Sequence, residues 1–351
     1  MVKNTRNCNN YVWGNSVFYI MAEKTNIFTL TKQDTAVLKG IAIIAMLMHH
    51  LWGCPPAGVE PYTGLLGFLG SVGKVCVAIF LFCSGYGLSV GYQKSMNDCC
   101  MNNGDWKQKV LATLKFLVKR LIKFYANYWF IFLIFVPISV FCFGRPLSAA
   151  YGESMNVFSG LVFDFFGIQG FLSYNITWWF NKLIILLYLT FPLLYFCVKK
   201  GGWVVAMASL LCMQLSDRLG SLNYYEILLW QCPMVFGILW HEKEQSLNKV
   251  RLQRNLMTYY SVVPFISLII LLLYRYGIVP HILHIRSGIY MDAIIVVMMA
   301  LCVVLMRNYS KHINVVFEFL GYHSMNIYMT HTFFFSYWFS SFFYSRELGG
   351  G

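Results

Sequence analysis

Charged side chains are scarce in this 351-residue chain. Asp, Glu, Lys and Arg together make up 12% of the residues, whereas a soluble domain has about 25%. Acidic residues are the scarcer of the two signs, with 14 Asp and Glu against 27 Lys and Arg. No polar linker or low-complexity tract divides the chain. These absences exclude a water-soluble globule and indicate a single domain that uses the bilayer as its solvent.

Metal-binding patterns are also missing. The eleven cysteines form no C-x-x-C pair and no Cys/His cluster with ligand spacing, so we expect no metal site and interpret them as packing residues. The N-terminal segment lacks an uninterrupted apolar stretch followed by a small-residue cleavage site. We therefore expect residues 1–34 to form a cytoplasmic or interfacial lead rather than a signal peptide.

What the chain has in abundance is apolar side chain, with 58% hydrophobic and 18% aromatic residues. Apolar runs long enough to cross a bilayer predict an all-α, polytopic transmembrane helix bundle of about nine to ten spans. A broken segment at 144–177 is expected to be an extracytoplasmic loop with re-entrant or interfacial pieces. The nine candidate runs lie at 36–53, 72–92, 124–143, 178–198, 203–216, 227–240, 258–274, 289–306 and 322–344.

The distribution of Lys and Arg predicts the orientation. With the N-terminus in the cytoplasm, 20 of the 27 cations fall on the cytoplasmic side, 5 fall outside, and Lys74 and Lys182 lie within or beside spans. This bias follows the positive-inside rule. It also explains the net charge of +13 without nucleic acid, which we do not expect as a partner. The predicted location is the plasma (inner) membrane.

Two adjacent histidines, His49 and His50, lie in the first apolar run. Ionisable side chains inside a membrane are costly and usually functional. Lys39 precedes His50 by eleven residues, about three helical turns, so these two share a face while His49 points about 80° away. At this spacing His50 lies about 16 Å from Lys39, near the middle of the bilayer. His50 is thus either a general base or a histidine that merely bonds neighbouring helices.

Several motifs resemble one family. They are Lys39, ten residues and His50; Ser84-Gly85-Tyr86 in the second run; the basic stretch from Arg120 to Lys123; the Trp, Tyr and Pro of 177–194; and a Gly, Ser, Ile-Tyr and His pattern at 319–335. In this order they resemble acyltransferase family 3, the integral membrane O-acyltransferases that act on bacterial surface polysaccharides and related glycans. Lysine stands where the family more often has arginine, at Lys39 and Lys123, which keeps the charge but loses the bidentate fork for phosphate.

The resemblance implies a reaction and its residues. An acyl group, expected to be acetyl, would move from cytoplasmic acyl-CoA to a hydroxyl of an extracytoplasmic sugar. His50 would be the general base, and Lys39 would stabilise phosphate or the carbonyl oxyanion. Arg120 and Lys123 would bind acyl-CoA, although positive-inside retention or anionic lipid also explains such a loop. The expected lining of an acceptor channel is Ser84, Tyr86, Ser324, Tyr328 and His331.

The same residues also allow other interpretations. Ser324, Tyr328 and His331 share a helix face and could simply hydrogen-bond between helices. Asp292, inside the eighth run, could pair with Arg286 or orient an imidazole. A transporter or exporter built on the same fold is the main alternative function, while a lipid-linked glycan polymerase is disfavoured. We expect the acyltransferase domain over 35–345 and a tail over 346–351 that lacks the further helix usual in relatives. The sequence leaves the acceptor, the acyl chain, a covalent acyl-enzyme and the oligomeric state open.

Overall fold

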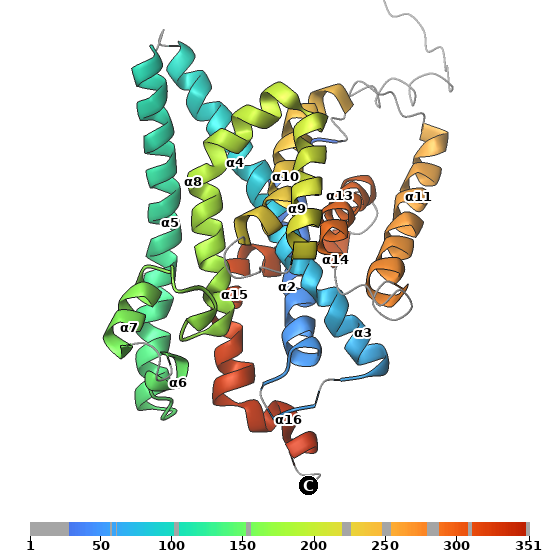
Figure 1. The fold of residues 1–351 in the computed structure, drawn as a ribbon. Coiled ribbons are helices and arrows are strands. Elements are labelled where there is room, and N and C mark those ends of the chain that lie inside the picture. The colour runs from blue at the N-terminus through green and yellow to red at the C-terminus, as the bar shows by residue number, and fades with distance from the viewer. Residues whose placement is uncertain are drawn as a thin grey trace, which may run out of the picture.

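The computed structural model describes residues 28–56, 58–60, 62–101, 105–151, 156–219, 226–247, 254–278, 288–307 and 311–348, which are almost entirely helical and contain no strand. Figure 1 shows the long helices standing side by side as a bundle. The elements are α2 (Lys32–Met48), η1 (His49–Gly53), α3 (Gly64–Val72), η2 (Gly73–Val75), α4 (Cys76–Met101), α5 (Trp106–Phe141), α6 (Ser148–Tyr151), α7 (Val157–Phe165), η3 (Gly170–Leu172), η4 (Ile176–Trp178), α8 (Trp179–Gly201), α9 (Trp203–Leu219), α10 (Glu226–Leu247), α11 (Arg254–Leu273), η5 (Tyr274–Ile278), α13 (Ile289–Met306), α14 (Lys311–Tyr322), α15 (Ser324–Thr332), η6 (Phe333–Trp338) and α16 (Ser340–Leu348).

The predicted membrane helix bundle is confirmed. Within the described residues, five helical segments are long and apolar enough to cross a bilayer, and two shorter apolar helices lie at 203–216 and 262–277. The five segments are Lys32–Gly53, Gly64–Asp98, Trp106–Phe141, Ile176–Gly201 and Ile289–Met306. The predicted N-terminal lead lies mostly outside the described residues.

The last predicted run, 322–344, is not one continuous helix. It is divided into the end of α14, then α15, the π-helical turn η6 and α16. The break at His323 falls where polar residues begin, and Phe339 leaves the helical region with a φ of −124°. The mean hydropathy of residues 322–344 is apolar because aromatic side chains outnumber the polar ones, and a mean over the whole run does not show where the helix breaks.

Helix α2, which carries Lys39 and continues into the turn η1 with His50, is fixed at its N-terminus by a capping box. The Thr31 hydroxyl accepts the backbone N–H of Asp34 at 3.1 Å, and the Asp34 carboxylate accepts the backbone N–H of Thr31 at 2.7 Å. Arg307 then donates two hydrogen bonds to the same carboxylate, at 3.0 and 2.6 Å. Such a cap stabilises a helix by about 1 kcal/mol, and the arginine ties α2 to the end of α13.

Close helix contacts hold α2 and α4 in place. On α2, a Cβ added to Gly40 would lie 2.0 Å from the carbonyl oxygen of Phe317 in α14. On α4, a Cβ added to Gly85 would lie 2.2 Å from the carbonyl oxygen of Met234 in α10. Small residues allow such backbone approach in membrane bundles. The Gly of the Ser-Gly-Tyr motif is therefore explained by packing.

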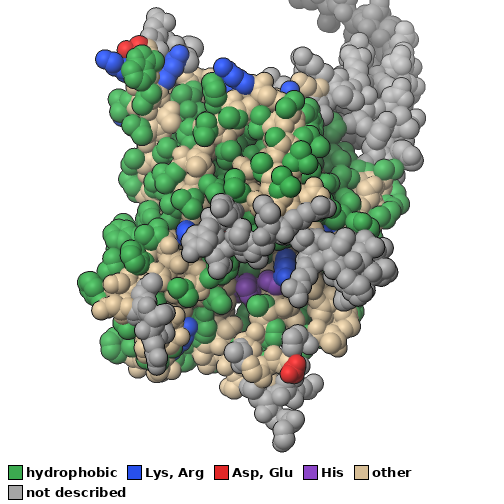
Figure 2. Space-filling model, viewed as in Figure 1, with side chains coloured by type: hydrophobic (Ala, Val, Ile, Leu, Met, Phe, Trp, Pro, Cys, Tyr) green, Lys and Arg blue, Asp and Glu red, His purple; other side chains and the backbone are tan. Residues whose placement is uncertain are grey.

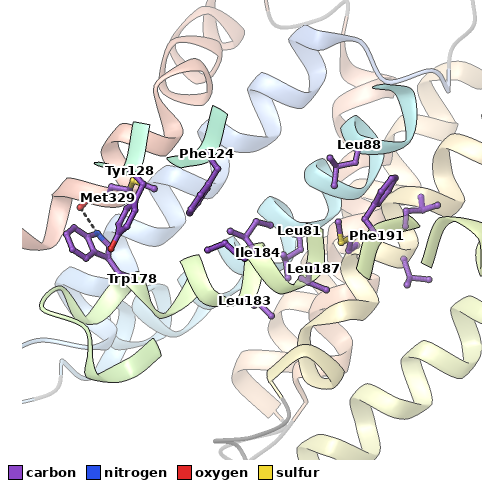
Figure 3. Packing of buried hydrophobic residues seen from close by; sticks show 14 of the residues in the cluster. Leu81, Leu88, Phe124, Tyr128, Trp178, Leu183, Ile184, Leu187, Phe191 and Met329 are labelled. Atoms are coloured by element: carbon purple, nitrogen blue, oxygen red, sulfur yellow. Dashed lines mark hydrogen bonds between the residues drawn. The ribbon is translucent and has the colours of Figure 1, made fainter. Parts of the chain in front are cut away.

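The largest hydrophobic cluster joins α5, α8 and α15. Figure 3 shows Trp178, Tyr128 and Phe124 beside Met329 in this cluster, and the Trp178 indole N–H donates to the Met329 carbonyl at 3.1 Å. Because both indole and phenol rings are fully buried, α15 is held rigidly against α5 and the start of α8. This contact places His331 of α15.

The broken segment 144–177 forms short helices around a buried carboxyl. Asp164 of α7 accepts the Tyr151 hydroxyl at 2.8 Å and the Tyr174 backbone N–H at 2.5 Å. Burial raises the pKa of Asp164 to about 6 despite these hydrogen bonds. The network gives this otherwise irregular segment a fixed shape, which positions Tyr174 next to the cavity described below.

Candidate active site

A cavity of about 880 Å³ opens between the ends of α2, α4, α8, α13 and α15. Figure 2 shows histidine side chains inside a hollow of this face, with Lys or Arg side chains beside it. His49 and His50 line it, together with Tyr328 of α15 and the aromatic rings of Trp179 and Trp230. The cavity therefore combines imidazoles, hydroxyls and apolar rings.

The two histidines lie where α2 widens into the π-helical turn η1. Such π-turns are rare and often occur at functional sites. Gly73 lies so close to this turn that an added Cβ would be 2.7 Å from the His49 Cβ. The His49 Nδ1–H donates to the Gly70 carbonyl at 2.9 Å. Neighbouring glycines thus allow η2 and α3 to hold the turn tightly.

The structure differs from the expected helix geometry at this point. His49 was expected to point about 80° away from the face shared by Lys39 and His50, and both histidine side chains line the same large cavity. Both histidines belong to the π-helical turn η1 rather than to a regular α-helix. His49 is nevertheless tied to Gly70, so the two imidazoles differ in freedom.

His331 of α15 joins this pair. The ring centroids of His50 and His331 are 4.9 Å apart, and those of His49 and His50 are 5.0 Å apart. The Nδ1–H of His331 donates to the Tyr328 carbonyl at 2.8 Å, while its buried Nε2 has no hydrogen-bond partner among the described residues. A neutral His331 bonded in this way presents the Nε2 lone pair. The predicted base and the predicted channel histidine are thus direct neighbours.

A second cavity of about 180 Å³ contains the other end of the lysine and histidine motif. Lys39 lines it with Ser84 and Ser324. The Ser84 side chain lies beside that of Tyr188, another lining residue. Asn181 also lines it, and both amide atoms of this fully buried side chain lack a hydrogen-bond partner within the described residues. This small cavity therefore has unsatisfied polar capacity.

Three aromatic residues line both cavities: Phe80, Phe180 and Tyr328. The rings of Phe180 and Tyr328 pack edge to face with centroids 5.5 Å apart, and those of Phe80 and Phe180 are 6.4 Å apart. The Tyr328 hydroxyl donates to the Thr177 carbonyl. We call these three residues the aromatic partition. It separates the Lys39 cavity from the His50 cavity.

The remaining predicted residues lie outside the two cavities. Arg120 approaches Gly91 of α4, and its guanidinium is 5.1 Å from the Phe116 ring centroid. It also lies within electrostatic range of Tyr188 in the small cavity. Lys123 is exposed. Tyr86 is buried, and its hydroxyl donates to Glu244 at 2.8 Å, a contact that joins α4 to α10.

Three cations that the sequence did not predict as site residues line the large cavity: Arg145, Arg275 and Lys74. Arg275 lies 3.4 Å from Asp292, which also accepts the Tyr276 hydroxyl at 2.8 Å. The sequence does carry a signal for these three cations, because cations predicted on the extracytoplasmic side or within spans are few and each one therefore stands out. The alternative partner of Asp292, Arg286, lies outside the described residues.

No group of three or more His, Cys, Asp or Glu side chains suited to a metal ion occurs in the described part of the chain. Comparison with known families gives a match to the acyltransferase domain of acyltransferase family 3 over residues 36–347. Curated proteins and solved structures give no significant match. The match covers nearly the whole chain, so the chain belongs to this family and is a multi-pass membrane acyltransferase that uses an acyl donor.

Proposed function

Because the chain is a family 3 acyltransferase, we propose that it transfers an acetyl or similar short acyl group from cytoplasmic acyl-CoA to a hydroxyl of an extracytoplasmic sugar. The supporting observation is that one continuous helical segment, α2 with η1, presents Lys39 to the small cavity and His50 to the large cavity. The aromatic partition between them marks the place where donor and acceptor meet. The protein acts in the plasma membrane with its N-terminus in the cytoplasm.

The donor occupies the side of the small cavity. Coenzyme A has a polyanionic head that stays in the aqueous phase and a thin arm that fits between helices. Arg120 and Lys123 bind the head. Arg120 lies within electrostatic range of Tyr188, which lines the small cavity. Lys39 lines this cavity rather than the large one. Its position favours contact with the arm or a phosphate over contact with an oxyanion at His50.

The acceptor occupies the large cavity, and His50 is the general base. The acceptor oxygen forms a bond to the thioester carbonyl carbon while its proton passes to the His50 imidazole. The carbon–sulfur bond then breaks, and the proton leaves with the coenzyme A thiol. His331 accepts a hydrogen bond at Nε2 from the acceptor or from His50, because its Nδ1–H is held by Tyr328. Tyr328 adds a polar side chain to the wall of this cavity, whereas Ser324 lines the small one.

The test is the sidedness of the reaction. In sealed inside-out vesicles, radiolabelled acetyl-CoA in the bath should acetylate a glycan trapped in the lumen. In right-side-out vesicles, external acetyl-CoA should give no product. Product formation that requires donor and acceptor on the same side would contradict the through-membrane reaction. Flux of a solute without acyl transfer would instead favour a transporter.

A further inference from the structure

Cations are concentrated around the large cavity. Its lining contains Lys74, Arg145 and Arg275, and Asp292 is the acidic residue among the described lining residues. With neutral histidines this leaves a net charge of +2 on the wall. Charged side chains around a cavity of a membrane protein cost free energy unless a counter-charge compensates them, so an excess of two positive charges needs a cause.

The Arg145 side chain is fixed in the cavity wall by two aromatic rings and a backbone carbonyl. Its guanidinium lies 4.3 Å from the Tyr174 ring centroid and 3.6 Å from the Tyr337 ring centroid. One nitrogen donates to the Tyr174 carbonyl at 2.8 Å. No carboxylate of the described chain comes within ion-pair distance of it, although Asp164 interacts with it electrostatically at longer range. A guanidinium has five N–H donors, so donors remain for a ligand.

The other two cations differ in environment. Lys74 is exposed in η2 and lies within electrostatic range of His49 and Asp292 without forming an ion pair with a described residue. Arg275 is 7% exposed and is partly neutralised by Asp292. Two of the three cations therefore lack an ion-pair partner among the described carboxylates, and both face the same cavity.

The positive-inside rule does not account for these cations. In the proposed orientation Arg145 and Arg275 lie on the extracytoplasmic side, and Lys74 lies within or beside a span. The positive-inside rule explains Lys and Arg in cytoplasmic loops, and it gives no reason for cations on the extracytoplasmic side. Among the described cations outside the cytoplasmic side, these three converge on one cavity. A ligand that carries negative charge explains this convergence.

The same wall has features suited to a sugar. Trp179 stacks on Phe171 with ring centroids 5.1 Å apart, and Trp230 lies on the same wall. Hydroxyls from Thr332 and Ser336 also line the cavity. We propose that the acceptor is an acidic sugar, whose carboxylate or phosphate is bound by Arg145 and Lys74 beside the histidines. This inference rests on the proposed function, since it names the class of acceptor.

Binding of matched disaccharides tests the inference without relying on turnover. The His50→Ala protein, in phosphatidylcholine nanodiscs, is titrated with cellobiose, cellobiouronic acid and cellobiose 6-phosphate. At least one of the two anionic sugars should bind about tenfold more tightly than cellobiose, because a charge-assisted hydrogen bond is stronger than one between neutral groups. The two anionic arms distinguish a carboxylate site from a phosphate site. The preference should weaken with salt.

Variants locate the preference. Lys74→Gln and Arg145→Gln should each reduce it several-fold, Arg145→Lys should retain part of it, and Lys200→Gln, which removes an exposed cation far along α8, should leave it unchanged. Equal binding of all three sugars, including no detectable binding by folded protein, would overturn the inference. So would a preference insensitive to Lys74 and Arg145, or displacement of the sugar by phosphatidylglycerol. Acetyl transfer to cellobiose as fast as to the acidic sugars would also overturn it and leave the acyltransferase function intact.

Discussion

The two cavities on either side of the aromatic partition differ in size and in chemistry. The large cavity, at about 880 Å³, contains imidazoles and excess positive charge, while the small one, at about 180 Å³, has Lys39 and uncharged polar groups. A cavity as small as the second suits a thin acyl or pantetheine chain rather than a sugar. The comparison shows that one helical segment, α2 with η1, places a lysine at the small cavity and a histidine at the large one.

The largest expected effect concerns the base of the large cavity. We expect His50→Ala to lower acyl transfer by about 10²–10⁴-fold, the contribution of a general base, with membrane insertion and folding largely intact. His49→Ala should retain much more activity, because His49 is tied to the Gly70 carbonyl. Transfer is measured with labelled acetyl-CoA at equal protein level. Equal loss in both variants, or full activity in His50→Ala, would show that the assignment is wrong.

The wall of the large cavity should respond to pH through Asp164. Burial raises the pKa of this carboxyl to about 6 from a usual value near 4 in the unfolded chain, so the folded state binds its proton more tightly. The resulting stability is fully present below about pH 4 and is lost as pH rises through 6. The two-unit shift sets an upper limit of about 3 kcal/mol.

The isosteric substitution Asp164→Asn isolates this contribution. The variant keeps an acceptor for Tyr151 and Tyr174 but cannot ionise, so its unfolding temperature should change less between pH 4.5 and 7.5 than that of the original protein. Thermal unfolding in nanodiscs measures the difference. If both proteins show the same pH dependence, the buried carboxyl does not limit the stability of this wall.

The partition itself can be opened. Phe180→Ala removes a ring that lines both cavities, so water should reach the thioester when no acceptor is bound. We expect the ratio of acetyl transfer to acetyl-CoA hydrolysis to fall about tenfold, close to 1.4 kcal/mol. Phe196→Ala, an exposed ring on the same helix, is the control. If the aromatic partition does not exclude water from the thioester, both variants should keep the original ratio of acetyl transfer to hydrolysis.

The sequence predicted much of this arrangement, and particular residues show where it stopped. Lys39 and His50 were found because one helix carries both, and the Ser324, Tyr328 and His331 face because they repeat along another. The ring contact between His50 and His331 joins α2 to α15, nearly three hundred residues later, and no local period encodes it. The π-turn at His49 packs against Gly70 and Gly73, and these contacts come from another helix that no local pattern encodes.

The site around Arg145 was not predicted for a related reason. A single arginine in a Gly- and Pro-interrupted segment has no periodicity, and its ring contacts come from Tyr174 and Tyr337. Tyr86 shows the reverse case, because its motif was visible but its contact with Glu244 lies on another helix. Its place in an acceptor channel stays a prediction. Tertiary neighbours, rather than composition, decide these roles.

The smallest expected effect lies on the donor side and separates two cations of one motif. Arg120 reaches toward Gly91 and lies near Tyr188, whereas Lys123 is exposed. If both bind coenzyme A phosphate, Arg120→Ala should raise KM for acetyl-CoA about fivefold and Lys123→Ala about twofold, since exposed charge pairs contribute about 1 kcal/mol or less. Because exposed contacts are screened over about 8 Å at physiological ionic strength, salt should shrink the Lys123 effect more. Lys200→Ala is the control, and unchanged KM in both variants would leave positive-inside retention as the explanation of these cations.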